Sequence, residues 1–167
     1  MKKNMLIFFK KSRCIFFTFI ARAIYKDFGA SIRCHGLVIL RNCNLGANLH
    51  FNGAKVYGGG HVEIGDNFHS GKGLQILTSN HDFNTLSLPY GREVVHKNVC
   101  IGRNVWIGMG VLILPGVSIG HGAIIQAGAV VGSDIPPLSI AGGNPARVFK
   151  MRDEELYYKA DSLKNYI

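Results

Sequence analysis

Apolar residues recur at every sixth position through much of the second half of this chain. Each member of one series is followed, two positions later, by a member of a second series. Two apolar residues separated by one position point to the same face of a short strand, so each pair predicts a strand with one buried side. The first series comprises Val99, Val105, Val111, Val117, Ala123, Ala129 and Ile135, and the second comprises Ile101, Ile107, Ile113, Ile119, Ile125 and Val131.

A turn has to fit into the remaining positions of each six-residue unit, and the residues found there suit turns. Glycine follows the second series at several of its positions, and Asn104 lies just after one of these glycines. Glycine and asparagine tolerate the positive φ angles that some turns need. One unit therefore predicts one strand and one corner, and three units predict a triangular coil. Hexapeptide periods of this kind are typical of parallel β-helices.

The pattern extends towards the N-terminus in two further registers. A one-residue shift between them predicts a bulge or a longer corner near residues 52–55. Residues 37–135 are therefore expected to form around five coils of an all-β domain that spans 34–150. The nearer register contains Val56, Val62, Phe68 and Leu74 with Ile64 and Ile76, and the earlier one contains Leu37, Cys43 and Leu49 with Ile39, Leu45 and Phe51.

The N-terminal segment, residues 1–33, is basic and rich in aromatic residues. Its longest uninterrupted apolar run, 14–21, is far shorter than the ~20 residues that span a bilayer. Residues 1–26 predict a helix, and three interpretations stay open. The helix lies on an anionic membrane surface, or it packs over the end of the main domain or against a neighbouring subunit, or the segment is a cleaved secretory signal.

Charge and cysteine content narrow the function further. The formal net charge is +9, but eight of the 19 lysines and arginines lie within residues 1–33, opposed there by Asp27 alone. The basicity therefore belongs to the N-terminal segment, which argues against a nucleic-acid-binding surface on the main domain. The four cysteines form no CxxC motif and predict reduced, mostly packed thiols in a cytosolic protein.

The C-terminal stretch, residues 151–167, is expected to be a short helical tail. Asp153, Glu154 and Glu155 lie near the start of the expected helix, where carboxylates are favourable. A stack of coils exposes unpaired strand edges at its two ends. We expect the N-terminal segment and this tail to cap them.

The six-residue register breaks once, between Ile76 and Val99. The intervening residues 77–98 follow no period, and detours of this length in a compact domain are usually functional. His81 lies near the start of this loop and is the candidate catalytic residue, with His96 as the alternative. Asp82 is not assigned as its orienting partner, because adjacent residues of an extended chain point to opposite sides. A carboxylate or carbonyl from another coil is expected to orient His81.

Residues 40–150 resemble the hexapeptide-repeat acyltransferases, and in particular the sugar, maltose and galactoside O-acetyltransferases and the capsular-polysaccharide acetyltransferases. The resemblance implies a left-handed parallel β-helix, a homotrimer, and coenzyme A in a groove between neighbouring prisms. It also implies that His81 is the catalytic loop histidine, because that residue precedes the Trp-Ile-Gly motif by about the distance from His81 to Trp106. The motifs are Val105-Trp106-Ile107-Gly108, Leu114-Pro115-Gly116-Val117, Asp134-Ile135-Pro136-Pro137 and Gly143-Asn144-Pro145-Ala146-Arg147-Val148.

The chemistry that the resemblance implies is acetyl transfer from acetyl-coenzyme A, with no metal required. His81 would remove the proton of the acceptor hydroxyl, which contributes roughly 10²–10⁴-fold, and a backbone N–H at a coil corner would stabilise the oxyanion. Trp106 either belongs to this site or packs at a corner. Ser133 stands where the family often has a basic residue. The coenzyme A contacts carried over by the resemblance are Met109, Ala127, Gly132, Ser133, Arg147 and Lys150.

The expected function is O-acetylation of a saccharide in surface-polysaccharide biosynthesis, in the cytoplasm or at the inner face of the cytoplasmic membrane. N-acetylation of a sugar nucleotide and O-acetylation of serine are alternatives on the same scaffold. A zinc-dependent carbonic anhydrase is a remote alternative, because no HxxxxH pair is present to supply convergent zinc ligands. The other remote alternative is a non-catalytic trimeric scaffold.

Overall fold

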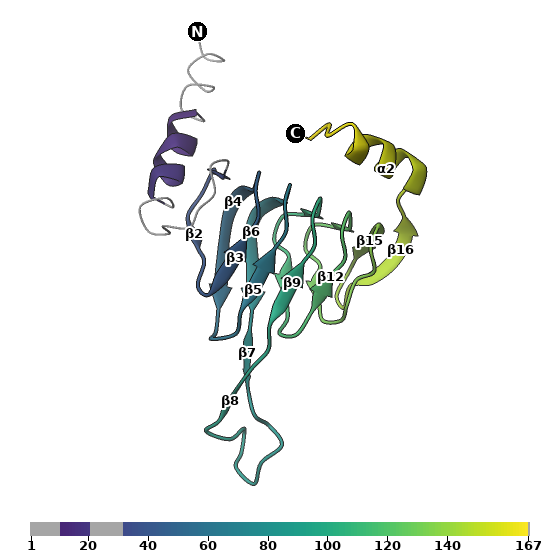
Figure 1. The fold of residues 1–167 in the computed structure, drawn as a ribbon. Coiled ribbons are helices and arrows are strands. Elements are labelled where there is room, and N and C mark those ends of the chain that lie inside the picture. The colour runs from purple at the N-terminus through teal and green to yellow at the C-terminus, as the bar shows by residue number, and fades with distance from the viewer. Residues whose placement is uncertain (1–10, 21–31, 167) are drawn as a thin grey trace.

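The computed structural model describes residues 11–20 and 32–166 of the chain, and residues 32–151 wind into a three-sided parallel β-helix (Figure 1). The first face has six parallel levels, in the order β1-β4-β6-β10-β13-β15, and one antiparallel strand, β16, at its end. These strands are β1 (Arg33–Cys34), β4 (His50–Tyr57), β6 (His69–Leu77), β10 (Trp106–Ile107), β13 (Ile124–Ile125), β15 (Ser139–Gly142) and β16 (Arg147–Met151).

The other two faces complete each coil. The second face is built from β2 (Val38–Ile39), the C-terminal halves of β4 and β6, β11 (Leu112–Ile113) and β14 (Val130–Val131). The third face is built from β3 (Cys43–Leu45), β5 (Val62–Ile64), β9 (Val99–Ile101) and β12 (Ser118–Ile119).

The predicted coil of three six-residue units is confirmed by the strand register. Cys100 pairs with Ser118 on the third face and Leu112 pairs with Val130 on the second, so equivalent residues are 18 positions apart. Every member of the two apolar series between residues 99 and 135 is buried, with at most 4% of its surface exposed. The core is thus a column of stacked aliphatic side chains, which is the main stabilising feature of the domain.

The earliest register differs from the prediction. Leu37, expected to face inward, is 50% exposed, whereas its neighbours Val38 and Leu40 are buried. The reason is the short corner at residues 41–42, across which the inward-facing Leu40 and Cys43 are only three positions apart. Val38 therefore pairs with the inward-facing Ala54 of β4. Since side chains alternate along a strand, this one-residue difference reverses the face of each residue in β2.

The predicted register shift near residues 52–55 is present, but it is shared between two corners. The chain turns at Gly53, whose φ is +92°, so that Phe51 and Ala54 face inward only three positions apart. The regular spacing across a corner is four, as from Ile101 to Val105. The following corner, between Tyr57 and Val62, is correspondingly long and contains three consecutive glycines.

Residues 11–20 form a helix that covers the first coil. Phe17 packs against the core, the hydroxyl of Thr18 accepts a 3.0 Å hydrogen bond from the backbone N–H of Cys34, and Arg13 donates to the carbonyl of His35 at 2.9 Å. Residues 11–20 therefore pack over the end of the main domain, as one of the three interpretations of the N-terminal segment predicts. The remainder of the predicted helix, 1–10 and 21–26, lies outside the described residues. No helix among the described residues is long and apolar enough to span a membrane.

The last coil is capped by a strand rather than by the predicted C-terminal helix. β16 pairs antiparallel with β15 and covers its free edge. The predicted helix is present as α2 (Glu154–Ser162), where the Asp153 side chain accepts a 2.8 Å hydrogen bond from the N–H of Leu156. α2 folds back along one corner of the coil, with Tyr157 buried beneath it.

None of the four cysteines, Cys14, Cys34, Cys43 and Cys100, forms a disulfide within the described ranges. Cys34 is buried, and burial raises the pKa of the Cys43 thiol to about 11. Cys100, in contrast to the packing expected for most thiols, is exposed on β9.

Candidate active site

The predicted loop 77–98 is a hairpin that projects away from the coil (Figure 1). Its two strands, β7 (Ser79–His81) and β8 (Val94–His96), pair antiparallel, with His81 opposite Val94. The His81 imidazole is exposed and stacks on the ring of Tyr90, with centroids 4.0 Å apart and planes inclined by 18°. The hairpin thus presents an imidazole, stacked on an aromatic ring, to the outside of the chain.

The surroundings of His81 differ from the expectation that another coil orients it. Its ring contact within the described chain is Tyr90, which belongs to the same loop. Asp82 is occupied locally, since its carboxylate accepts a 2.9 Å hydrogen bond from the N–H of Asn84, and its carbonyl accepts one from Gly91 at 2.7 Å. Asp82 therefore stabilises the shape of the loop through these two hydrogen bonds.

His96, the alternative base, lies at the foot of the hairpin. Its Nδ1 is 2.6 Å from the Ser79 hydroxyl, which also accepts a 3.0 Å hydrogen bond from the N–H of Gly59. Next to it, Lys97 donates its backbone N–H to the carbonyl of Thr78 at 2.9 Å. His96 is thereby engaged in joining the hairpin to the coil, whereas His81 is free of such bonds in the described part of the chain.

Met109 and Ala127 occupy equivalent corners of successive coils. We call this column of corners, from Asn52 through Lys72, Met109 and Ala127 to Gly143, the Met109 edge. The carbonyl of Met109 accepts a 2.8 Å hydrogen bond from the N–H of Gly128. Glycines allow the coils to approach here, because a Cβ at Gly108 would collide with the backbone nitrogen of Ala127. The backbone N–H groups of Met109 and Ala127 donate no hydrogen bond to any part of the chain that is described.

Gly132 and Ser133 lie at a different corner. They follow β14, whereas Ala127 precedes it, so the strand Val130–Val131 separates the two parts of the predicted coenzyme A site. This second column of corners, through Gly59, Lys97, Gly116 and Ser133, is also where the hairpin leaves the coil. Both Gly132 and Ser133 are exposed.

Arg147 and Lys150 both lie on β16. Arg147 pairs with Gly142 and follows Ala146, whose N–H donates to the carbonyl of Val130 at 2.8 Å. This position is at the C-terminal end of the Met109 edge. Lys150 pairs with Ile140 and lies further along the first face. Both cations are exposed, so both are accessible to a phosphate.

The structure thus brings Met109, Ala127 and Arg147 to one edge and leaves the other predicted residues elsewhere. Gly132 and Ser133 lie across a strand from that edge, at the corner from which the hairpin that carries His81 projects. The sequence interpretation missed Tyr90 and also Lys72, the counterpart of Met109 one coil earlier. The sequence does contain a signal for Lys72. It lies between two glycines in Gly71-Lys72-Gly73 before the loop, as Met109 does in Gly108-Met109-Gly110 after the loop.

Trp106 is not packed at a corner. It is the first residue of β10, is 57% exposed, and pairs with His69 on one side and Ile124 on the other. His69 stacks on His50 with ring centroids 4.1 Å apart. These two histidines are the first residues of β4 and β6.

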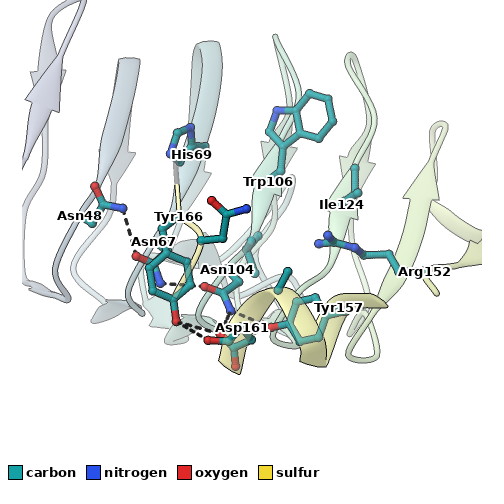
Figure 2. Close-up of a pocket in the computed structure, with 13 residues that line it drawn as sticks. Asn48, Asn67, His69, Asn104, Trp106, Ile124, Arg152, Tyr157, Asp161 and Tyr166 are labelled. Atoms are coloured by element: carbon teal, nitrogen blue, oxygen red, sulfur yellow. Dashed lines mark hydrogen bonds between the residues drawn. The ribbon is translucent and has the colours of Figure 1, made fainter. Parts of the chain in front are cut away.

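A pocket of about 470 Å³ lies between this face and α2, and Figure 2 shows the residues that line it. A ladder of side-chain amides crosses it, with Asn48 donating to Asn67 at 3.1 Å and Asn67 donating to Asn104 at 2.8 Å. Asn104 in turn donates to Tyr157 Oη and to Asp161, each at 2.9 Å. The pocket contains none of the predicted catalytic or coenzyme A residues. Its polar groups attach the C-terminal helix to the coil, because Asn104 bonds to two residues of α2.

Comparison with known proteins agrees with this architecture. Residues 95–133 match the family model described as bacterial transferase hexapeptide, six repeats. No curated protein matches the chain in sequence. Among solved structures, the chain is similar to a hexapeptide-repeat acetyltransferase from Vibrio cholerae O1 biovar eltor in complex with acetyl-coenzyme A. The two are 30% identical with a TM-score of 0.60, and the match covers 68% of this chain and 62% of the other.

Two further solved structures are similar. A galactoside acetyltransferase in complex with coenzyme A is 32% identical with a TM-score of 0.60, over 68% of this chain and 57% of the other. A maltose O-acetyltransferase from Clostridium difficile 630 is 36% identical with a TM-score of 0.52, over 74% of this chain and 65% of the other. The chain therefore spans less than two thirds of the length of each of these three proteins. From its repeat, its coil and these likenesses, the chain belongs to the hexapeptide-repeat acetyltransferase family.

Proposed function

We propose that this protein is an acetyl-coenzyme A-dependent O-acetyltransferase that acts on a saccharide hydroxyl, with His81 as its general base. The observation that carries the proposal is the exposed imidazole on a hairpin that projects from an otherwise regular coil. Detours of this kind place functional residues on a rigid scaffold. The galactoside and maltose acetyltransferases among the similar structures support a saccharide acceptor for this chain.

The proposed reaction is a direct transfer. His81 takes the proton of the acceptor hydroxyl while the oxygen attacks the thioester carbonyl of acetyl-coenzyme A. The tetrahedral intermediate then expels the coenzyme A thiolate as the carbon–sulfur bond breaks. The imidazolium of His81 returns its proton to that thiolate, so the base is restored in each turnover.

The Met109 edge supports a binding role for the thioester and the pantetheine arm. The N–H groups of Met109 and Ala127 face no acceptor in the described chain and are therefore open to carbonyl oxygens of a ligand. Preorganised backbone donors of this kind stabilise a developing oxyanion without reorganisation. Arg147, at the end of the same edge, is assigned to the phosphates of coenzyme A, with Lys150 and the Gly132–Ser133 corner as further contacts.

We propose that the site is completed between protomers of a homotrimer. In one chain the hairpin leaves the coil at the corner that contains Ser133, and the second face separates this corner from the Met109 edge. A neighbouring protomer would bring its own His81 to the Met109 edge of this chain. A place in surface-polysaccharide biosynthesis, at the cytoplasmic side where acetyl-coenzyme A is available, is part of the same proposal.

The test is incubation of the purified protein with acetyl-coenzyme A and a panel of acceptors, namely glycosides, amino-sugar nucleotides and serine. Thiol release and the mass of the product are measured. We expect acetylated glycosides whose acetyl group is removed by mild alkali, as an ester is and an amide is not. Transfer only to amines or to serine would overturn the assignment of a saccharide hydroxyl. Transfer to none of the three classes would overturn the proposed activity.

A further inference from the structure

A basic hollow adjoins the proposed thioester site. Two openings, of about 330 and 360 Å³, share Gly36, Asn52 and Lys72 in their walls. The first opening is also lined by Arg13, and the second by Lys55. We call this continuous surface the Lys72 hollow. Its first opening lies between the helix over residues 11–20 and the early coils, and its second opening is lined by the early coils alone.

The Lys72 hollow is in line with the Met109 edge. The carbonyl of Lys72 accepts a 2.8 Å hydrogen bond from the N–H of Gly110, directly after Met109. Asn52 pairs with Lys72 in the next coil towards the N-terminus. A ligand that extends from the thioester at Met109 along this edge therefore reaches Lys72 first and Asn52 next.

Among the described residues, the charged side chains that line the hollow are all positive. Arg13, Lys55 and Lys72 contribute cationic groups, and no aspartate or glutamate of residues 11–20 or 32–166 lines either opening. Lys55 and Lys72 form no ion pair with residues 11–20 or 32–166, and both are exposed. Cations clustered without counter-charges repel one another, so they favour an anion between them. A neutral saccharide would not require this arrangement.

We propose that the Lys72 hollow binds a phosphate or diphosphate group carried by the saccharide acceptor. This inference rests on the proposed function, because it assigns the acceptor class of that same site. The Lys72 ammonium and the Arg13 guanidinium pair with phosphate oxygens, and the amide of Asn52 lies beside them in the same wall. The sugar attached to the phosphate then extends along the edge towards Met109, where acetyl transfer takes place.

Two kinds of molecule carry this chemistry, a soluble nucleotide-linked sugar and a sugar linked through diphosphate to a membrane lipid. Arg13 connects the hollow to the helix over residues 11–20. The outward side of this helix exposes three large apolar residues, Ile15 at 70%, Phe16 at 58% and Phe19 at 73%. The experiments below separate the two sources.

The first experiment measures binding without turnover. Inorganic pyrophosphate is titrated calorimetrically into the full chain saturated with coenzyme A, which occupies the Arg147 region. We expect pyrophosphate to bind the wild type and Lys72→Gln to weaken binding roughly 10-fold, as loss of one charge-assisted contact implies. Lys159→Gln on α2 removes the same charge far from the hollow and serves as the control. Absence of binding, or equal weakening by both substitutions, would overturn the proposal.

The second experiment measures acceptor preference. Methyl glycosides and the corresponding glycosyl 1-phosphates are compared as acceptors, and kcat/KM is determined for each pair. We expect the wild type to prefer the phosphate, and Lys72→Gln and Arg13→Gln to reduce this preference roughly 10-fold, through KM rather than kcat. If the wild type acetylates neither acceptor, the proposed function fails, while the pyrophosphate titration still tests the hollow. If it acetylates both equally, the hollow assignment fails and the proposed function stands.

The third comparison identifies the source of the phosphate. A nucleotide-linked sugar in solution is compared with the same sugar linked by diphosphate to a polyprenol in phosphatidylcholine vesicles. Preference for the vesicle substrate, lost in Phe16→Ser together with Phe19→Ser, assigns the lipid-linked form. Preference for the soluble substrate, unchanged in that double variant, assigns the nucleotide-linked form. Equal weak use of both, with no dependence on Lys72, contradicts the phosphate assignment itself.

Discussion

The imidazole of His81 lies flat on the phenol ring of Tyr90, across the hairpin loop that carries both residues. Two backbone hydrogen bonds hold this loop in shape, from Asp82 to the carbonyl of Glu93 at 3.0 Å and from Gly91 to the carbonyl of Asp82 at 2.7 Å. Tyr90 is thereby fixed against the candidate base by the chain's own backbone. We infer that Tyr90 positions His81.

Removal of this aromatic support is expected to slow transfer without abolishing it. Tyr90→Ala frees the imidazole to adopt other rotamers, so kcat should fall by roughly 5-fold, as for a stacking contact worth about 1 kcal/mol. Tyr90→Phe keeps the ring and should keep at least half of the wild-type kcat. Steady-state kinetics with acetyl-coenzyme A as the varied substrate provides the measurement. Equal losses in both variants would assign the effect to the hydroxyl rather than to stacking.

Replacement of the base itself is expected to have a larger effect. His81→Ala should lower kcat by about 10²–10⁴-fold, because the hydroxyl proton loses its acceptor. The Kd for coenzyme A, measured by calorimetry, should change by no more than a few-fold. His96→Ala is the comparison, since its imidazole is bonded to Ser79 at the foot of the hairpin. If His96→Ala abolished transfer and His81→Ala did not, the catalytic roles would be exchanged.

The phosphate contact assigned to Arg147 is expected to depend on the 3′-phosphate of coenzyme A. Arg147→Ala should weaken coenzyme A binding roughly 10-fold and dephospho-coenzyme A binding by less than half that factor, because a guanidinium pairs with phosphate in a fork. Lys150→Ala, on the same strand, is the matched variant. Titration of both ligands into both variants decides the assignment. Equal losses for the two ligands would move Arg147 to the diphosphate.

The amide ladder predicts how strongly the C-terminal helix is held. Asn104 donates to both Tyr157 and Asp161, and the Asp161 carboxylate also forms an ion pair with Arg103. The Arg103 guanidinium, followed by the Asn104 amide, lowers the pKa of Asp161. Asn104→Ala removes three side-chain hydrogen bonds, including the one accepted from Asn67, and a residue suited to its positive φ of +58°, so it should destabilise the fold by roughly 1–3 kcal/mol. Asn98→Ala, away from α2, is the control in chemical denaturation.

Much of the coil could be predicted from the sequence, because the six-residue period indicates which side chains face inward. The burial of the two apolar series that begin at Val99 and Ile101 depends only on local alternation and on a turn every six residues. Contacts with distant parts of the chain therefore do not change it. The prediction that Leu37 faces inward was wrong because it assumed a turn of constant length every six residues. Near the start of the coil the corners are irregular, and the short corner at residues 41–42 moves the inward face by one residue.

The site was less predictable because it depends on outward-facing residues. Periodicity carries no information about an aperiodic loop, so the contact between His81 and Tyr90 could not be derived from it. Lys72 and Met109 are neighbours only when the register is counted through the hairpin between them. β16 was missed because all five of its residues, Arg147–Met151, are exposed and show no alternating burial.

The stacked histidines of the first face predict a stability that depends on pH. Burial, followed by the positive charges of His69, Arg33 and His35, lowers the pKa of His50 from 6.5 to about 4. In the unfolded chain His50 takes up a proton below about pH 6.5, whereas in the folded chain it stays neutral until about pH 4. The unfolded state thus binds more protons between these values, so the free energy of unfolding is greatest above pH 6.5 and falls towards pH 4.

His50→Phe keeps an aromatic ring on His69 and removes this titration. We expect the wild type to lose roughly 1–2 kcal/mol more than this variant between pH 7 and pH 4.5, after allowance for partial exposure. Urea unfolding at both pH values gives the difference, with His121→Phe, which keeps a ring beside Tyr157 and Tyr158, as the control outside the stack. A pH dependence identical in wild type and His50→Phe would show that His50 is protonated equally in the folded and unfolded states. The effect is separable from catalysis, because His50 lies on the first face and His81 on the projecting hairpin.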